Sequence, residues 1–492
     1  MSSDLSTLKA RLADVNALHA AVTIMDWDQQ TYMPKGGGEA RAEHLGILSR
    51  MAHETLVSDE IRTALDKASP EAEDDEAMLR VVRRKIDLAT KIPTSLVEEK
   101  SRLSAIAHER WVAARAASDF ASFAPTLERM FEICGQEAEY RGYKDHPFDA
   151  LLDEYEQDAT AADVRAMFDS IKAPQVALVK EIADQPVIDD SMLYGEWEER
   201  LQREFTEMLI QAMGFDFNRG RQDKAPHPFC TGWSIGDIRL TTRYKPYVGS
   251  AIFGSMHEAG HGMYEQGSPM KWDRTPLSGG VSLAVHESQS RTWENIVGRS
   301  KPFWSHFLPA LQGKFPALAG LDLSTFYRAI NRVEPSYIRV EADELTYNLH
   351  ILVRFEIECD VLTGKLKVKD MPEAWNAKYT EYLGITPRND AEGCLQDVHW
   401  SMGSVGYFPT YSMGNLLSYQ IWRALEKDVP NTAELMAQGN FAPILGWLLE
   451  NVYSQGKRYT PKELVLRVTG KPISGEDYLA GLESKYREIY NI

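Results

Sequence analysis

The sequence has few cysteines, no long apolar run and no excess of basic residues, and each absence excludes a class of protein. The four cysteines among 492 residues are far apart and none is spaced as CxxC. This excludes a disulfide framework and a cysteine-rich structural zinc site, so we expect free thiols in a reducing compartment. No segment reaches the roughly 20 apolar residues of a membrane span. The N-terminus also lacks the basic start and apolar run of a secretory signal, so we expect a soluble, cytoplasmic protein.

The charge balance argues against nucleic acid as a partner. The chain carries 72 acidic against 54 basic residues, a formal net charge of -18. An acidic surface repels a phosphate backbone. Hydrophobic residues make up 43% of the chain, enough for a large core. Because we find no linker, repeat or low-complexity segment, we interpret residues 1–492 as a single domain.

Most of the chain has the pattern of amphipathic helices. Apolar residues recur at helical spacing from residue 4 to about 215, in segments rich in Ala, Glu, Leu and Arg. A Pro-Gly turn at residues 33–38 interrupts the first helical stretch. The later helices are expected at 39–54, 74–90, 95–118, 124–138 and 160–183, and the chain is helical again from residue 250. The fold class is therefore mainly α.

A short β segment precedes the second helical part. Residues 226–233 have the composition of a loop or edge strand, and residues 237–244 alternate apolar and polar side chains as a half-buried strand does. We expect a small sheet directly before the helix that begins near residue 250. An exposed edge of such a sheet can bind an extended peptide through backbone hydrogen bonds.

The segment 256–262 contains the pattern His-Glu-x-x-His. Residues four apart share a helix face, so His257 and His261 can present their imidazoles to one metal ion. Glu258 points to the neighbouring space, where an attacking water would lie. Two neutral nitrogen ligands and a carboxylate base are what a zinc peptidase requires. The alternative is a buried helix with two hydrogen-bonded histidines.

A third ligand is expected from a second helix at residues 282–291. A catalytic zinc takes three protein ligands and leaves one position for water. Either His286 or Glu287 could serve, but adjacent helical residues diverge by about 100° and both cannot do so. Glu287 completes a His₂Glu set and is the preferred choice; the alternative is a surface Glu near a helix end.

Two later segments concentrate polar groups. In residues 338–344, Arg339 could bind a carboxylate with two hydrogen bonds. In the region that follows residue 393, His399, Tyr407 and Tyr411 could stabilise an oxyanion. The alternatives are a solvated helix face, on which Arg339 pairs with Asp343 four residues on, and an aromatic core.

Taken together, these residues resemble the Taq-type thermostable metallocarboxypeptidases, zinc enzymes that remove single amino acids from peptide C-termini. The resemblance covers essentially the whole chain. It is carried by an opening Trp27-Asp28 and Glu39-x-Arg41 and by five ordered motifs, Asp237-x-Arg239-x-Thr241, His257-Glu258-x-x-His261, His286-Glu287-Ser288-Gln289, Ile338-Arg339-x-x-Ala342-Asp343 and Gly393-x-x-Gln396-Asp397-x-His399-Trp400. It implies a nearly all-α fold, a deep groove between two helical halves, and a homodimer.

The resemblance also implies roles for individual residues. His257, His261 and Glu287 are expected to bind one Zn²⁺ per subunit, in a site that Co²⁺ or Mn²⁺ can also occupy, and Glu258 is expected to be the general base. Arg339 is the expected anchor for the substrate's free carboxylate, with Arg239 as the alternative. The oxyanion candidates are His399 and one of the two tyrosines. Asp237, Asp343 and Asp397 are candidates for carboxylates that orient the histidines.

Three rival functions remain at this point. An aminopeptidase needs acidic residues that hold a free amine, and an oligoendopeptidase needs no anchor for a terminal carboxylate. A peptide-binding scaffold without catalysis is the third. The scaffold has no use for Glu258 beside three metal ligands, which argues against it. Among the peptidases, the resemblance implies a carboxypeptidase that acts on peptides with a free C-terminal carboxylate.

Overall fold

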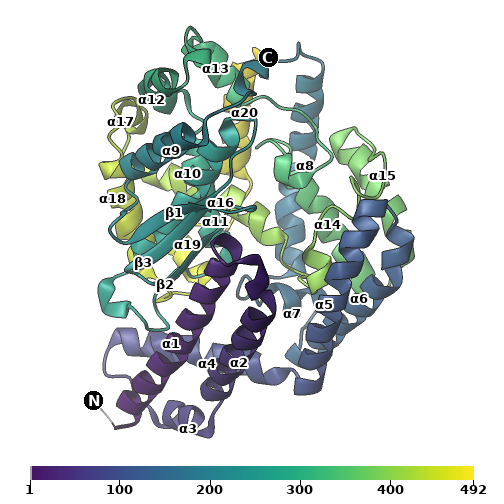
Figure 1. Ribbon diagram of the computed structural model, residues 1–492, viewed down its shortest axis with the longest axis vertical. Coiled ribbons are helices and arrows are strands. Elements are labelled where there is room, and N and C mark those ends of the chain that lie inside the picture. The colour runs from purple at the N-terminus through teal and green to yellow at the C-terminus, as the bar shows by residue number, and fades with distance from the viewer. Residues whose placement is uncertain (1–2) are drawn as a thin grey trace.

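The computed structural model describes residues 3–492, which form a mainly α-helical fold with one small sheet (Figure 1). The first helices are α1 (Ser3–Thr31), α2 (Gly38–Leu56), α3 (Asp59–Lys67), α4 (Glu73–Lys91), α5 (Thr94–Ala117), α6 (Phe120–Arg141), α7 (Pro147–Leu152), α8 (Ala161–Ala183) and α9 (Glu199–Met213). After the sheet come α10 (Gly249–Gln266), α11 (Leu283–Arg291), α12 (Lys301–Lys314), α13 (Leu323–Ile330), α14 (Tyr347–Leu362), α15 (Met371–Leu383), α16 (Pro409–Asp428), α17 (Thr432–Ala437), α18 (Ala442–Asn451), α19 (Pro461–Thr469) and α20 (Glu476–Tyr490). The expected fold class is confirmed. Within the described residues, no helix has the length and apolar character needed to cross a bilayer.

The longer helices begin and end near the predicted residues, and the differences have local causes. Helix α6 begins at Phe120, four residues before the expected start, because the Asp119 side chain accepts a hydrogen bond from the Ser122 N–H. Helix α3 was not predicted, although it buries Ile61, Ala64 and Leu65 at helical spacing, and the Ser58 side chain caps its first turn. Apolar periodicity therefore located the helices, and caps determined where they begin.

The sheet contains three strands in the order β1-β3-β2. Strand β2 (Cys230–Ser234) pairs antiparallel with β3 (Asp237–Thr242), which agrees with the expected edge strand and half-buried strand. Strand β1 (Gly220–Lys224) lies parallel to β3 on its other side. The sequence pattern does not predict β1, because Gly-Arg-Gln-Asp-Lys has no apolar alternation. Since β2 is at the edge, one of its sides has no neighbouring strand within the sheet.

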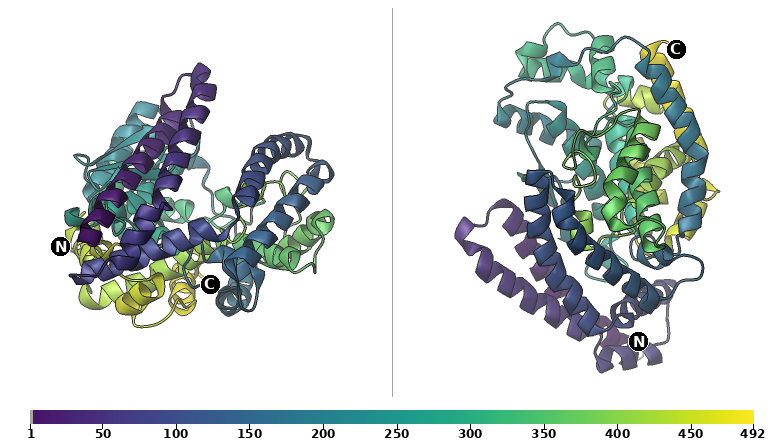
Figure 2. Two further views of the ribbon diagram at one scale, coloured as in Figure 1. Left: turned by 90° about the horizontal axis from the view of Figure 1, so that it is seen from below. Right: turned by 90° about the vertical axis from the view of Figure 1, so that its right-hand side faces the viewer.

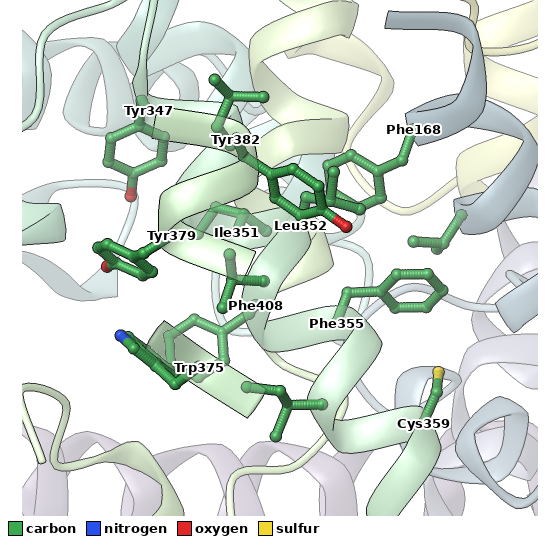
Figure 3. Packing of buried hydrophobic residues seen from close by; sticks show 14 of the residues in the cluster. Phe168, Tyr347, Ile351, Leu352, Phe355, Cys359, Trp375, Tyr379, Tyr382 and Phe408 are labelled. Atoms are coloured by element: carbon green, nitrogen blue, oxygen red, sulfur yellow. The ribbon is translucent and has the colours of Figure 1, made fainter. Parts of the chain in front are cut away.

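Three hydrophobic clusters form the core. One joins α1, α3 and α4; a second joins α5–α8, α14, α15 and α20; a third joins α9, the sheet, α10, α12, α13, α18 and α19. Figure 3 shows the second cluster around α14, where Phe168 and Phe355 face each other. Helices α11 and α16 contribute to both large clusters. Ala284 of α11 and Met413 of α16 belong to the cluster around α14, whereas Val285 and Leu417 belong to the cluster around the sheet. These two helices therefore lie at the junction of the two larger cores.

Two helical hairpins, α1–α2 and α5–α6, project from the same side of the molecule and diverge from each other (Figure 2). The α1–α2 hairpin is attached to the sheet by side chains at the end of α1. The Arg239 guanidinium lies between the rings of Trp27 and Trp233, 4.2 and 4.3 Å from their centroids. The Tyr32 hydroxyl donates a hydrogen bond to Asp223 of β1. The opening motif of the chain thus packs against the strand motif more than 190 residues later.

Candidate metal centre

The two helices that carry the expected ligands approach each other closely at a glycine. A Cβ atom at Gly260 of α10 would lie 2.6 Å from the carbonyl oxygen of Gln289 in α11. On the other side of α11, a Cβ atom at Gly414 of α16 would lie 2.5 Å from the Cβ of Glu287. Neither distance is possible for a side chain, so only glycine allows these backbone separations. The two glycines let α10 and α16 pack against the helix that carries Glu287.

This packing brings His257, His261 and Glu287 together. Their potential ligand atoms all lie within 4.8 Å of one another, and the Nε2 atoms of the two histidines are each 3.6 Å from Glu287 Oε2. Ligands about 2.05 Å from a tetrahedral zinc ion are separated by about 3.3 Å. The three side chains therefore fit one metal ion with little movement. Of the two candidates for the third ligand, the structure brings Glu287 to this position.

The other ring nitrogen of each histidine is held by a further side chain. His257 Nδ1 lies 2.9 Å from Glu294 Oε2. His261 Nδ1 lies 3.0 Å from His286 Nδ1, and His286 Nε2 lies 2.5 Å from Glu265 Oε1. These contacts orient both rings with Nε2 toward Glu287. His286 is thus a support for His261 rather than a member of the ligand cluster.

The expectation that Asp237, Asp343 and Asp397 orient the histidines is wrong. Asp237 pairs with Arg239, and Asp343 accepts hydrogen bonds from the backbone N–H groups of residues 334, 345 and 346. Asp397 pairs with two arginines. Each of these carboxylates instead accepts hydrogen bonds from donors close to it. The order of the motifs along the sequence does not determine which of them lie near the metal ligands.

The carboxylates and cations around the cluster shift the pKa values of its members in the metal-free protein. Burial lowers the pKa of His257, but Glu287 and Glu294 outweigh this effect and raise it to about 9. Burial, together with the charges of Glu287 and Glu294, raises the pKa of Glu258 to about 7, although His257 and Arg291 lower it. Arg291 donates to Glu287 Oε1 at 2.6 Å and to Glu294 Oε2 at 3.2 Å, which offsets part of this negative charge. A carboxyl group with a pKa near 7 can both accept and donate a proton at neutral pH.

The cluster opens into a pocket of about 480 Å³. Residues 228–232, which include the first three residues of β2, form one wall, and Tyr407 and Tyr411 belong to another. Glu258 lines the same pocket as the three potential ligands. The edge strand expected to receive an extended peptide therefore borders the metal cluster.

His399 is not among the residues that line this pocket. Its ring packs against Tyr407 and Phe408, with centroids 5.4 and 4.7 Å apart. Burial lowers the pKa of His399 to about 4, so the imidazole is neutral at pH 7. Its buried Nδ1 has no hydrogen-bond partner among the described residues and lies 3.8 Å from Asp397 Oδ1. Of the three oxyanion candidates, the two tyrosines line the pocket and His399 packs against one of them.

Arg339 is buried in an ionic cluster instead of lying on a helix face. It belongs to a short 3₁₀ turn (Arg339–Glu341), so the alternative pairing with Asp343 along one α-helix is wrong. Its Nη2 donates to Asp397 Oδ1 at 2.8 Å, and its Nη1 donates to the Tyr347 hydroxyl at 2.9 Å. Arg354 of α14 donates to Asp397 Oδ2 at 2.6 Å. Two guanidinium groups and one carboxylate give this cluster a formal charge of +1.

The two arginines proposed as carboxylate anchors differ in their relation to the pocket, and neither lines it. The Arg339 guanidinium lies 5.2 Å from the centroid of the Tyr411 ring, and Tyr411 lines the pocket. Arg239 is held between two tryptophans and paired with Asp237. Arg339 is therefore one side chain away from the pocket, whereas Arg239 serves to attach α1 to the sheet.

Sequence reasoning missed several residues of the site. Glu294 and Arg291 could have been found, because they lie seven and four residues after Glu287 and so share its helix face. Glu265 lies four residues after His261 in α10 and could have been found by the same rule. Arg354 carries no such signal, because its partner Asp397 is 43 residues away in the sequence.

Comparison with known proteins places the whole chain in one group. A family profile described as "Carboxypeptidase Taq (M32) metallopeptidase" matches residues 7–486. The chain is 40% identical to "Thermostable carboxypeptidase 1" of Thermus thermophilus over an alignment of 500 positions, which covers 98% of this chain and 96% of that protein. It is 39% identical to "Carboxypeptidase 1" of Bacillus subtilis over 477 residues, which cover 96% and 95%. A crystal structure of a carboxypeptidase from Deinococcus radiodurans superimposes with a TM-score of 0.98 at 37% identity, covering 100% of both chains.

Proposed function

Because the chain belongs to the carboxypeptidase Taq metallopeptidase family and is a metallocarboxypeptidase, we propose that it uses one Zn²⁺ to release single amino acids from the C-termini of peptides. The observation that carries this proposal is the convergence of His257, His261 and Glu287 in one pocket with Glu258. Two imidazoles and one carboxylate form the ligand set of many catalytic zinc sites. Co²⁺ and Mn²⁺ also bind such a set, so metal analysis of the purified protein tests the choice of ion.

When bound, a divalent ion in this site polarises the scissile carbonyl and lowers the pKa of a water molecule. Glu258 then removes a proton from the attacking water and returns it to the leaving amine. Its burial and raised pKa suit both transfers at neutral pH. His257 and His261 must present Nε2 without a proton, and Glu294 and His286 hold the rings in that orientation.

The hydroxyl groups of Tyr407 and Tyr411 are the proposed donors to the oxyanion. Both side chains line the pocket that contains Glu258, and their oxygens are 3.5 Å apart. Burial raises the pKa of both phenols, so both retain the proton that they must donate. His399 is a further candidate donor, and its position suits support of Tyr407 better. A Phe substitution at either tyrosine separates their contributions.

The arginine cluster is the proposed recognition element for the free carboxylate. Burial raises the pKa of Glu358 beside this cluster to about 8, so that group is largely neutral at pH 7 and the +1 charge stays uncompensated. A substrate carboxylate entering the pocket would neutralise it. Arg339 is the anchor in this proposal, because Asp397 keeps Arg354 as a partner if Arg339 turns toward the substrate. Arg239 is the alternative anchor.

The remaining parts of the proposal concern organisation. We propose that residues 1–492 act as a single catalytic domain, that substrates enter a deep groove between the two helical halves, and that two copies form a homodimer in the cytoplasm. Helices α11 and α16 at the junction of the two larger cores support this view of the halves. The acidic charge argues against nucleic acid as a partner. Sedimentation equilibrium tests the dimer.

Two measurements test the activity against its rivals. An N-blocked dipeptide with a free C-terminus should be cleaved, and the same peptide amidated at its C-terminus should be a poor substrate. An aminopeptidase would cleave neither, and an endopeptidase would not distinguish the termini of a longer peptide. Glu258→Gln is isosteric and leaves the ligands in place, but its amide cannot accept a proton. The variant should keep stoichiometric metal and lose nearly all turnover; retention of a tenth of the activity or more would refute the assignment of the base.

A further inference from the structure

A second cavity, of about 580 Å³, lies between α8, α16, α19 and α20. It shares no lining residue with the pocket around the metal cluster. Its volume falls within the range of small-molecule sites in proteins, about 300–1,000 Å³. The walls are mostly apolar and include Val164, Met167, Val465, Leu466, Ile473 and Leu479. The cavity therefore suits a ligand with an apolar body.

The charged side chains of this cavity are predominantly acidic. Glu156, Asp163 and Glu476 line it, against the single cation Lys462. Lys462 already pairs with Asp163 at 3.3 Å, and Glu476 pairs with Lys471 at 2.9 Å. Glu156 is the lining carboxylate for which no ion pair with a lysine or arginine is found in residues 3–492. This charge pattern favours a positively charged ligand group over a carboxylate or a zwitterion.

Glu156 is a buried carboxyl group with unused acceptor capacity. It is 3% exposed, and Oε2 accepts a hydrogen bond from the Ala284 N–H at 3.1 Å. The carboxyl group also bonds the Ser282 side chain. A carboxylate offers about four acceptor positions, so at least one remains for a ligand. Burial raises the pKa of Glu156 to about 7, although the bonds from Ser282 and Ala284 and the charge of Lys462 lower it.

The cavity is connected to the metal centre through helix α11. Glu156 bonds the first turn of α11, and the Tyr155 carbonyl accepts a hydrogen bond from the Leu283 N–H at 3.4 Å. Glu287 lies one helical turn further on. Met413 lines the cavity, and its neighbour Gly414 packs against the Cβ of Glu287. A ligand in this cavity would thus contact Glu156, which bonds the first turn of α11, and Met413, whose neighbour packs against Glu287 of α11.

We propose that this cavity binds a small molecule with an apolar body and one protonated amine, that the amine contacts Glu156, and that occupancy slows metal release through α11. The binding part does not depend on the peptidase activity. The coupling follows because an anionic group at a helix N-terminus stabilises the first turn. A bound ammonium keeps Glu156 in its charged form at that position.

Binding is tested with n-hexylamine as the probe, titrated into the full-length, metal-loaded protein by calorimetry. Hexan-1-ol has a similar apolar body without charge, and hexanoate carries the opposite charge. We expect hexylamine to bind at least tenfold more tightly than either control. Equal affinity for hexan-1-ol, or no binding of hexylamine, would overturn the proposal.

Two substitutions locate the site. Glu156→Gln removes the charge and should reduce the affinity for hexylamine to that for hexan-1-ol. Because this residue also supports α11, a second variant avoids it: Ala166→Trp, on the exposed side of α8, places an indole in the cavity. Ala162→Trp is the matched control, one turn earlier on α8 and outside the lining. Loss of binding in Ala166→Trp but not in Ala162→Trp supports the site, and equal binding in all variants refutes it.

The coupling is tested by the rate at which a chelator removes the metal. Saturating hexylamine should slow this release at least threefold in the parent protein and in Ala162→Trp. It should have no effect in Ala166→Trp, which also controls for amine binding directly to the metal. An unchanged rate in the parent protein at saturation would refute the coupling, whatever the peptidase activity of the preparation.

Discussion

The substitution Arg339→Ala separates a carboxypeptidase that recognises a terminal carboxylate through this residue from one that does not. In the structure the Arg339 side chain donates to Asp397 through Nε and Nη2 and to Tyr347 through Nη1. A guanidinium can exchange such contacts for two parallel hydrogen bonds to a substrate carboxylate, which lysine cannot. Arg354 retains its hydrogen bonds to Asp397 in the variant, so the buried carboxylate is not left unpaired.

The expected magnitude follows from the loss of one partner of a buried, hydrogen-bonded charge pair. Such truncations cost about 2–5 kcal/mol. At about 1.4 kcal/mol per factor of ten, this corresponds to a loss of roughly 30-fold to several thousand-fold in kcat/KM on peptides with a free C-terminus. On amidated peptides, which lack the carboxylate, the substitution should change kcat/KM little. Arg339→Lys should fall between the parent and Arg339→Ala.

The assay compares both substrate classes under conditions in which all variants are folded by circular dichroism. Arg239→Ala is the matched control, because Arg239 is the alternative anchor and is held by Trp27 and Trp233. If free and amidated peptides decline together in Arg339→Ala, the residue acts through stability. If Arg239→Ala shows the selective loss instead, the anchor is Arg239 and the reasoning from the ionic cluster is wrong.

Three further predictions concern the metal. Glu287→Ala removes one of the three ligands, so the variant should lose the metal ion on dialysis while the apoprotein stays folded. Metal analysis and circular dichroism test this, and a stoichiometric metal content would place the third ligand elsewhere, with His286 as the first candidate. Glu294→Gln weakens the support of His257 and should reduce metal affinity about 10- to 100-fold in a chelator competition; an unchanged affinity would deny that support. Since the pKa of His257 in the apoprotein is raised to about 9, the imidazole must release its proton when the metal binds. The metal affinity should therefore rise about tenfold between pH 7 and pH 8, and a constant affinity would refute this.

The sequence predicted the parts of the site that depend on local spacing. His257 and His261 are four residues apart on α10, and their separation is a property of the helix itself. Glu287 followed from the chemistry of zinc sites and from the position of the next helix. The approach of these two helices depends on the glycine at position 260, whose role becomes evident only when Gln289 is seen against it.

The parts that could not be predicted depend on contacts between distant segments. The residues next to Asp397 in the sequence, Gln396 and Val398, do not indicate its partners. Its pairing with Arg339 and Arg354 requires the packing of α14 against the loop before α16. Similarly, β1 is a strand because β3 supplies its hydrogen bonds, although its own residues are polar. Long-range pairing of this kind overrides the preference of the segment.

The attachment of α1 to the sheet has a consequence for biosynthesis. Tyr32 and its partner Asp223 are 191 residues apart in the chain, so the end of α1 leaves the ribosome long before its docking surface exists. At about 5–20 residues per second, the delay is roughly 10–40 s. During that interval α1 can pack only on α2, α3 and α4, which are made soon after it, and Trp27 has no strand to cover it. Nascent chains stalled before β3 should therefore expose this indole to a chaperone or protease, and chains stalled after β3 should protect it.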